Sequence, residues 1–123
     1  MTPIRVVDSI TELQPADAGC IALSGSHGGL SSARYALAAR PLLAVFNDAG
    51  VGKDGAGIAG LALLQTHGIA ACTVSHTSAR IGQAASTLAD GVLSHANAAA
   101  LALGLRTGQA LASQIERLFR RPA

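Results

Sequence analysis

The sequence of 123 residues is poor in aromatic side chains, in charge and in cysteine. It has no tryptophan, one tyrosine and two phenylalanines, and the charged residues make up only 13% of it. Proteins that bind nucleic acids usually carry a basic stripe with aromatic side chains that stack on bases. Because the formal net charge is only +2 and aromatics are so few, we do not expect nucleic acid as a partner.

The two cysteines, Cys20 and Cys72, are too few for a disulfide framework, and both lie in apolar segments. The N-terminus lacks an apolar run of signal-peptide length. The longest weakly polar stretch, residues 96–105, is too short to cross a membrane, which takes about 20 apolar residues in a helix. We therefore expect a cytoplasmic protein with no membrane partner.

Half of the residues are hydrophobic, and the length of the chain suits one domain with a packed core. Short apolar runs alternate with alanine-rich stretches that favour helices. Strands are expected at residues 4–7, 20–23, 42–46, 69–74 and 91–93. Helices are expected at residues 31–39, 57–67, 78–89 and from 97 towards 119, with a break at Gly104 or Gly108 left open. This alternation predicts a single three-layer α/β domain over residues 1–123, Rossmann-like or flavodoxin-like, with a mainly parallel sheet of four to five strands.

Polar residues follow four of these strands, and three of the four strand ends carry a Ser-His pair. The four segments are Ser24-Gly25-Ser26-His27-Gly28-Gly29, Asn47-Asp48-Ala49-Gly50, Ser75-His76-Thr77-Ser78-Ala79-Arg80 and Ser94-His95-Ala96-Asn97. Serine, asparagine, aspartate and glycine are ordinary turn and cap residues, but histidine has no such preference. Parallel strands end at one edge of the sheet, where open α/β sheets bind ligands. The pattern therefore predicts one shared pocket at that edge.

The predicted pocket suits an anionic small molecule. Its glycines would let backbone amides approach the ligand, and the helix that follows adds the positive end of its dipole. Histidine exchanges protons near neutral pH, so His27 and His76, with Asp48 nearby, are the predicted catalytic residues. The predicted substrate-binding residues are Ser24, Ser26, Gly28, Gly29, Asn47, Lys53, Ser75, Ser78, Arg80, His95 and Asn97. Of these, Arg80 and Lys53 would hold a carboxylate or a phosphate.

The segment Gly50-Val51-Gly52-Lys53-Asp54-Gly55 matches the string GxGxxG, which dinucleotide-binding proteins carry between a strand and a helix. The acidic residue that would hold the ribose is missing, because the next strand ends in Ser75-His76. The spacing also departs from that of a P-loop. We interpret the segment as a flexible glycine-rich loop, either a lid over the pocket or a plain surface loop. The identity of any cofactor is left unknown.

Two other chemistries would use the same residues. The three strand-end histidines and Asp48 are zinc or iron ligands by type, but no pair has the HxH or HxxxH spacing of a preformed site, so no metal is predicted. A Ser-His-Asp hydrolase would use Ser24 or Ser26 as nucleophile, His76 as base and Asp48 as orienting group. The nucleophile elbow GxSxG of many such enzymes is absent.

The function predicted first is a small enzyme, or an enzyme subunit, that acts on an anionic small molecule by proton transfer. The alternatives are a non-catalytic domain that binds a metabolite in the same pocket and a structural subunit of a larger complex. If His27, Asp48, His76 and His95 lie in one cleft, the enzyme and the binding domain remain; if they point to different surfaces, the structural subunit is favoured. Turnover against binding alone then separates the enzyme from the binding domain. A leucine-rich stripe beside many alanines in the last helix predicts a homo-oligomer with residues 98–118 in the interface. The other interpretation is that this stripe covers the protein's own sheet.

Overall fold

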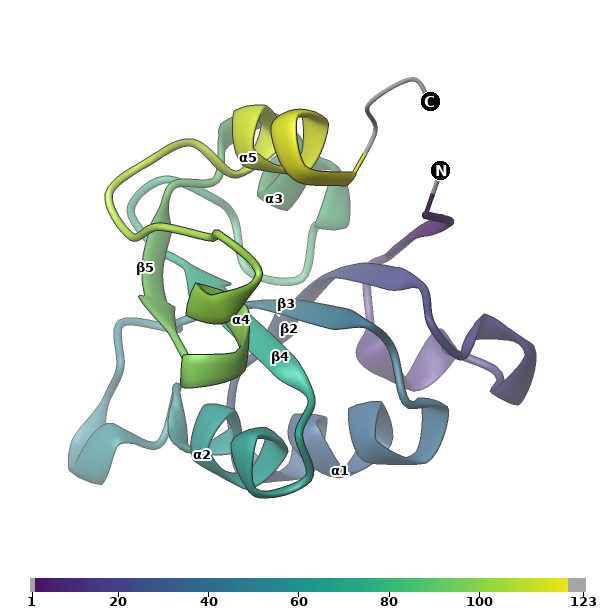
Figure 1. Ribbon diagram of the computed structural model, residues 1–123. Helices are drawn as coiled ribbons and strands as arrows, with labels where there is room; N and C mark the ends of the chain where they lie inside the picture. The colour runs from purple at the N-terminus through teal and green to yellow at the C-terminus, as the bar shows by residue number, and fades with distance from the viewer. Residues whose placement is uncertain (1, 120–123) are drawn as a thin grey trace.

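The computed structural model describes residues 2–119, which form a sheet of five strands between two layers of helices (Figure 1). The strands are β1 (Ile4–Val7), β2 (Ile21–His27), β3 (Leu43–Asn47), β4 (Ala70–Val74) and β5 (Leu93–Ala96). They lie side by side in chain order, β1-β2-β3-β4-β5. The first four strands are parallel, and β5 is antiparallel to β4. The prediction of a single Rossmann-like or flavodoxin-like α/β domain with a mainly parallel sheet is therefore confirmed.

Helices α1 (Leu30–Ala39) and α2 (Ala59–Thr66) cover one face of the sheet (Figure 1). The 3-10 turns η1 (Ile10–Glu12) and η2 (Pro15–Asp17) link β1 to β2, and η3 (Lys53–Gly55) precedes α2. Right-handed crossovers between sequential parallel strands place successive connections on the same face. The other face is covered by α3 (Ala84–Asp90), α4 (Ala98–Ala102) and α5 (Leu111–Phe119).

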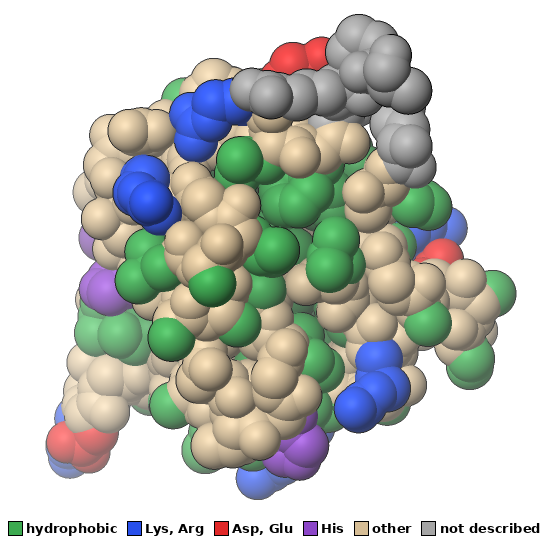
Figure 2. Space-filling model, viewed as in Figure 1, with side chains coloured by type: hydrophobic (Ala, Val, Ile, Leu, Met, Phe, Trp, Pro, Cys, Tyr) green, Lys and Arg blue, Asp and Glu red, His purple; other side chains and the backbone are tan. Residues whose placement is uncertain are grey.

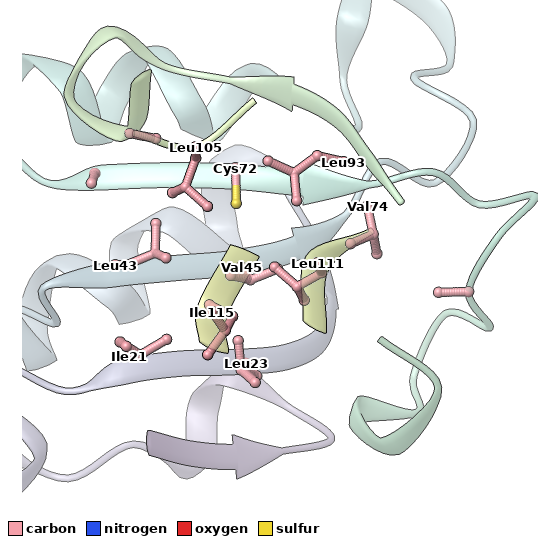
Figure 3. Close-up of a cluster of buried hydrophobic side chains, with 13 residues drawn as sticks. Ile21, Leu23, Leu43, Val45, Cys72, Val74, Leu93, Leu105, Leu111 and Ile115 are labelled. Atoms are coloured by element: carbon pink, nitrogen blue, oxygen red, sulfur yellow. The ribbon is translucent and has the colours of Figure 1, made fainter. Parts of the chain in front are cut away.

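Side chains that alternate along the strands divide the core into two clusters. Figure 3 shows the larger one, where Leu23 and Val45 of the sheet pack with Leu111 and Ile115 of α5. The opposite cluster is rich in alanine, and α1 and α2 approach each other closely there. At their contact a Cβ added to Gly60 would lie 2.5 Å from the carbonyl oxygen of Gly29, so only glycine fits.

The last predicted helix is in fact two helices, α4 and α5, separated by residues 103–110. Gly104 and Gly108 both have positive φ in this connection, at 105° and 81°, which glycine adopts at little cost. Leu105, Leu111 and Ile115 of the predicted stripe are no more than 1% exposed. The stripe therefore covers the protein's own sheet, and these three residues offer no interface to a second subunit.

The first half of the predicted helix at 78–89 is also wrong, because residues 78–83 form a turn and α3 begins only at Ala84. This turn is held against β2: the amide of Gly82 donates to the carbonyl of Gly25 at 2.7 Å. A Cβ on Gly25 would lie 2.5 Å from Gly82 C and Gln83 N, so the close approach requires glycine. Helical propensity in this segment is thus overridden by tertiary contact.

In the space-filling view, charged side chains lie scattered over the visible face and do not form a stripe of one sign (Figure 2). Within residues 2–119, no helix is both long and apolar enough to span a bilayer.

Candidate functional site

Strand β2 continues to His27 and includes the first half of the predicted glycine-rich turn. Ser24 is buried inside it, and its hydroxyl donates to the carbonyl of Val45 at 2.8 Å. The Ser26 hydroxyl accepts a hydrogen bond from the amide of Ile10 at 2.9 Å. Both predicted nucleophiles thus hold the fold together, and across residues 2–119 neither is hydrogen-bonded to a histidine. The structure does not assemble the predicted Ser-His-Asp triad.

The glycines of this segment do not form the predicted cradle of free amides, because their N–H groups are already hydrogen-bonded inside the protein. The acceptors are Asp8 O for Gly25, Asn47 O for Gly28 and His27 Nδ1 for Gly29. The glycines are needed for packing instead. A Cβ on Gly28 would lie 2.8 Å from the carbonyl oxygen of Gly57.

His27 ends β2, immediately before α1, and its side chain is exposed. The Nδ1 atom of its ring accepts a hydrogen bond from the amide of Gly29 at 3.0 Å, and the hydroxyl of Ser32 lies 3.4 Å from the same atom. An imidazole nitrogen that accepts an N–H cannot itself carry a proton. The neutral ring therefore carries its proton on Nε2, which is left as a hydrogen-bond donor.

A cavity of about 300 Å³ lies beside His27, at the edge where the parallel strands end. Its lining residues are His27, Ala49, Val51, Gly52, Ala56, Gly57 and Ile81. His27 is the one polar side chain among them. The volume is at the lower end of the range of about 300–1,000 Å³ that small-molecule pockets occupy. Of the predicted site residues, His27 is the only one that lines this cavity within residues 2–119.

Most of the cavity wall comes from the loop between β3 and α2, residues 48–58. Positive φ values occur at Ala49 (52°), Gly50 (76°), Val51 (67°), Gly52 (74°), Asp54 (57°) and Gly55 (70°). A β-branched residue such as Val51 rarely adopts this left-handed conformation. The amide of Val51 donates to Asp48 O and its carbonyl accepts from Gly57 N, both at 2.7 Å, which fixes it there. Strain of this kind is concentrated at functional sites.

Asp48 and His76 form a second polar group on the same edge. The Asp48 carboxylate, 4% exposed, accepts from the amides of Gly50 at 2.9 Å and His76 at 3.0 Å. His76 Nδ1 lies 3.3 Å from the same carboxylate oxygen, Oδ1, so a neutral His76 ring that donates there presents Nε2 as a base. Burial raises the pKa of Asp48, but hydrogen bonds from Gly50, Ser94 and His76 outweigh it and leave this pKa below its ordinary value.

The Asp48–His76 pair and His27 both lie next to the loop of residues 48–58, but at different residues of it. Asp48 directly precedes the cavity-lining residue Ala49, and a Cβ on Gly50 would lie 3.6 Å from the His76 ring. Neither Asp48 nor His76 lines the cavity itself. The two predicted catalytic histidines therefore lie on the same edge of the sheet, on either side of the strained loop.

Three other predicted ligand-binding residues are used as scaffold. Asn47 is fully buried, donating to Ala79 O at 3.0 Å and accepting from Ala49 N at 2.9 Å. Ser75 donates to the Ser78 hydroxyl at 2.8 Å, and that hydroxyl accepts from Val92 N at 2.9 Å. These contacts hold the ends of β3 and β4 in place, and they occupy polar atoms that we had assigned to a ligand.

Lys53 and Arg80 are the basic side chains nearest in sequence to the cavity wall, next to Gly52 and Ile81 respectively. Both are exposed. Over residues 2–119, neither takes part in a salt bridge. Their role in holding a carboxylate or phosphate group stays a prediction.

Asn97 is not part of this edge. Because β5 runs antiparallel to β4, its carboxyl end lies at the opposite edge of the sheet. Asn97 is buried there, accepting from Ala71 N at 3.0 Å and donating to Ile69 O at 2.9 Å. His95 pairs with Thr73 along the β4–β5 ladder, with 3.4 Å between its Nδ1 and the threonine hydroxyl. The prediction that Asn97 shares a rim with His27 and His76 is wrong.

Residues 2–119 contain no cluster of three or more His, Cys, Asp or Glu side chains that could hold a metal ion. Sequence analysis missed the apolar cavity wall, above all Val51 and Ile81. Val51 belongs to the glycine-rich string, so its place in the sequence could have indicated it. Ile81 lies in a segment predicted to be helical, so no sequence signal indicated it.

Comparison of the chain with models of known protein families, with curated proteins and with solved structures gave no match. The function is therefore argued from the geometry of the site.

Proposed function

We propose that the protein is a small enzyme, or a subunit of an enzyme, that acts on an anionic small molecule bound in the cavity beside His27. One observation carries this proposal: among residues 2–119, the only polar side chain in the wall of an otherwise apolar cavity is a histidine whose Nδ1 is fixed as an acceptor. Its Nε2–H can donate a hydrogen bond to a bound anion.

The surroundings of the cavity favour an anion. Lys53 and Arg80 extend from the two segments that contribute Gly52 and Ile81 to the wall. Arginine offers a bidentate fork to a carboxylate, and lysine acts as a point charge. On this proposal His27 Nε2–H donates a hydrogen bond to the ligand. Because His76 does not line the cavity, the His76–Asp48 pair would act as a base on a part of the substrate that extends beyond it.

Titration with small anions tests this proposal, with NMR signals of the four histidine rings as the measurement. We expect acetate or benzoate at millimolar concentration to shift the His27 ring signals, and His27→Gln to abolish the binding. Leu42→Asn, an exposed apolar position at the start of β3, is the matched control and should bind as the unaltered protein does. Binding that is unchanged in His27→Gln would contradict the proposal.

A non-catalytic domain that binds a metabolite is the second candidate. It is favoured by one observation, that His76 and Asp48 do not line the cavity together with His27. A ligand that binds beside His27 without chemical change, while His76→Ala leaves that binding unaltered, would favour this second function over catalysis.

We place the protein in the cytoplasm because Cys20 and Cys72 are both free and buried. Burial raises the pKa of the Cys72 thiol to about 12, so this thiol is inert. The homo-oligomer stays a prediction, with Leu101 of α4 as the exposed side chain of the stripe and Leu118 half-buried. Light scattering coupled to gel filtration tests it: we expect a dimer that Leu101→Lys weakens, and a monomer at all concentrations would contradict it.

A further inference from the structure

The walls of the cavity beside His27 are apolar on two opposed segments. Ala49, Val51 and Ala56 come from the loop between β3 and α2, and Ile81 comes from the turn that precedes α3. Ile81 is 52% exposed and is the one large exposed hydrophobic side chain of residues 2–119 that lines this cavity. Carbon atoms of a ligand in the cavity would cover this surface.

Val51 gives independent support for an apolar ligand body. Its φ of 67° is one that glycine adopts without strain and that a β-branched residue adopts only against steric cost. A glycine here would leave the loop less strained but would remove a branched apolar side chain from the cavity wall. We therefore attribute the valine at this position to its apolar contact surface in the cavity wall and not to its backbone conformation.

The backbone around the cavity restricts the head group of the ligand. The amides of the lining loop residues are all hydrogen-bonded within the protein: Ala49 to Asn47 Oδ1, Val51 to Asp48 O, Gly52 to Gly50 O, Ala56 to Lys53 O and Gly57 to Val51 O. Phosphate sites typically use several free amides around the oxygens. A carboxylate can be held by fewer groups, here His27 Nε2 with one of the two nearby cations.

The size of the cavity limits the body of the ligand. A cavity of about 150 Å³ lined by apolar side chains suffices to hold a benzene ring. The present cavity, at about 300 Å³, has room for one such ring or a branched chain of similar bulk together with a head group. It is small for a dinucleotide, which agrees with the missing acidic partner of the GxGxxG string.

We infer that the cavity binds a small monocarboxylate with a compact apolar body, which contacts Val51 and Ile81 while its carboxylate meets His27. This inference rests on the proposed function, since it specifies the chemical class of the anion at the same site.

Calorimetric titration of the full chain with four probes tests the inference: benzoate, acetate, benzamide and phenyl phosphate. Each buried methylene is worth roughly fourfold in affinity, so a ring that contacts Val51 and Ile81 should bind far better than a methyl group. We expect benzoate to bind at least about tenfold more tightly than each of the other three probes.

Ile81→Asn should weaken benzoate binding at least fivefold and leave acetate binding unchanged, while the control Leu42→Asn alters neither. Both positions are exposed, and thermal unfolding verifies that each variant is folded. Ile81→Ala, a milder change, should weaken benzoate in the same direction.

The outcomes separate this inference from the proposed function. Equal binding of benzoate and acetate would overturn the compact apolar body, and tighter binding of phenyl phosphate would overturn the carboxylate head group; in both cases an anion site beside His27 stands. Benzamide binding as tightly as benzoate, or no binding of any anion at millimolar concentration, would overturn the proposed anion site and the inference together.

Discussion

The two edges of the sheet use similar polar residues for opposite purposes. At the edge where β4 begins, both polar atoms of the Asn97 side chain are hydrogen-bonded to buried backbone, joining β4 to α2 and α4. At the edge where β2, β3 and β4 end, the side chains of His27, His76 and Arg80 stay exposed beside a cavity. A polar residue after a strand is thus a candidate for ligand binding only when its hydrogen bonds are not already used by the fold.

Backbone strain, seen as positive φ at non-glycine residues, also differs between the two edges. Among residues 2–119, four non-glycine residues have positive φ, and Ala49, Val51 and Asp54 of the cavity loop are three of them. The fourth, Arg40, ends α1 as a left-handed helix cap, an ordinary use of that conformation. Strain is therefore concentrated at the edge that carries the cavity, as expected if a binding site there is retained at a cost in folding stability.

The largest expected effect breaks the stable edge. Asn97→Ala removes a helix cap and leaves the amide of Ala71 and the carbonyl of Ile69 without partners in a buried place. Each buried group left unpaired costs about 1–3 kcal/mol, so we expect a loss of about 3 kcal/mol or more in the free energy of unfolding. Urea denaturation measures this loss, and a loss below about 1 kcal/mol would show that the hydrogen bonds of Asn97 contribute little to the stability of the fold.

A smaller effect is expected at Asp48, and it depends on pH. Because the pKa of this carboxyl is lower in the folded protein than its ordinary value of 3.8, the charged form stabilises the fold above that pH. The contribution is lost as the pH falls from 3.8 through the lower folded pKa. Asp48→Asn replaces charged by neutral hydrogen bonds, so it should cost about 1 kcal/mol at pH 7.

The acid limb of the stability curve checks the cause. Thermal unfolding between pH 2 and pH 7 should show a difference between the unaltered protein and Asp48→Asn that shrinks on acidification. A difference that stays constant over this range would mean that the charge of Asp48 plays no part.

Relief of the strained loop should give a gain of stability. Val51→Gly removes a left-handed strain of about 1–3 kcal/mol but adds the chain entropy of glycine, about 0.5–1 kcal/mol. The difference is a net gain of about 0–2.5 kcal/mol in unfolding free energy, and we expect weaker benzoate binding with it. A loss of stability would show that the side chain of Val51 supports the fold more than the cavity.

The smallest effect on stability is expected at His27, where function is proposed. His27→Gln keeps a hydrogen-bond acceptor near Gly29 N on an exposed side chain, so the unfolding free energy should stay within about 0.5 kcal/mol. Set against Asn97→Ala in the same urea assay, this variant sharpens the contrast between the edges. A destabilisation of several kcal/mol would place His27 among the structural residues.

Sequence patterns predicted the parallel part of the sheet well, because each of the strands β1 to β4 contains a short run that is mostly apolar and is followed by turn residues. They did not predict the direction of β5, which depends on whether the connection between β4 and β5 returns the chain to the end of the sheet where β4 begins. A parallel β5 would need a connection back to the other edge, but α3, with seven residues, turns towards β2 instead. Asn97 was misplaced for that reason.

The candidate site was predicted in part. His27 was found by residue type, since histidine is rare as a turn residue. The free amides of Gly28 and Gly29 were a wrong expectation, because hydrogen bonds made by the backbone cannot be seen in a sequence. Ile81 was missed because its segment has helical propensity, which the contact between Gly25 and Gly82 overrides.

The strictly sequential strand order has a consequence for biosynthesis. As the chain leaves the ribosome, the first four strands with α1 and α2 can close one face of the sheet by residue 74. The other face, with Ile21, Leu43 and Cys72, stays open until Leu111 and Ile115 of α5 arrive. A nascent chain or a truncation that stops short of α5 therefore exposes half of its core to solvent and to other chains, the situation in which aggregation competes with folding.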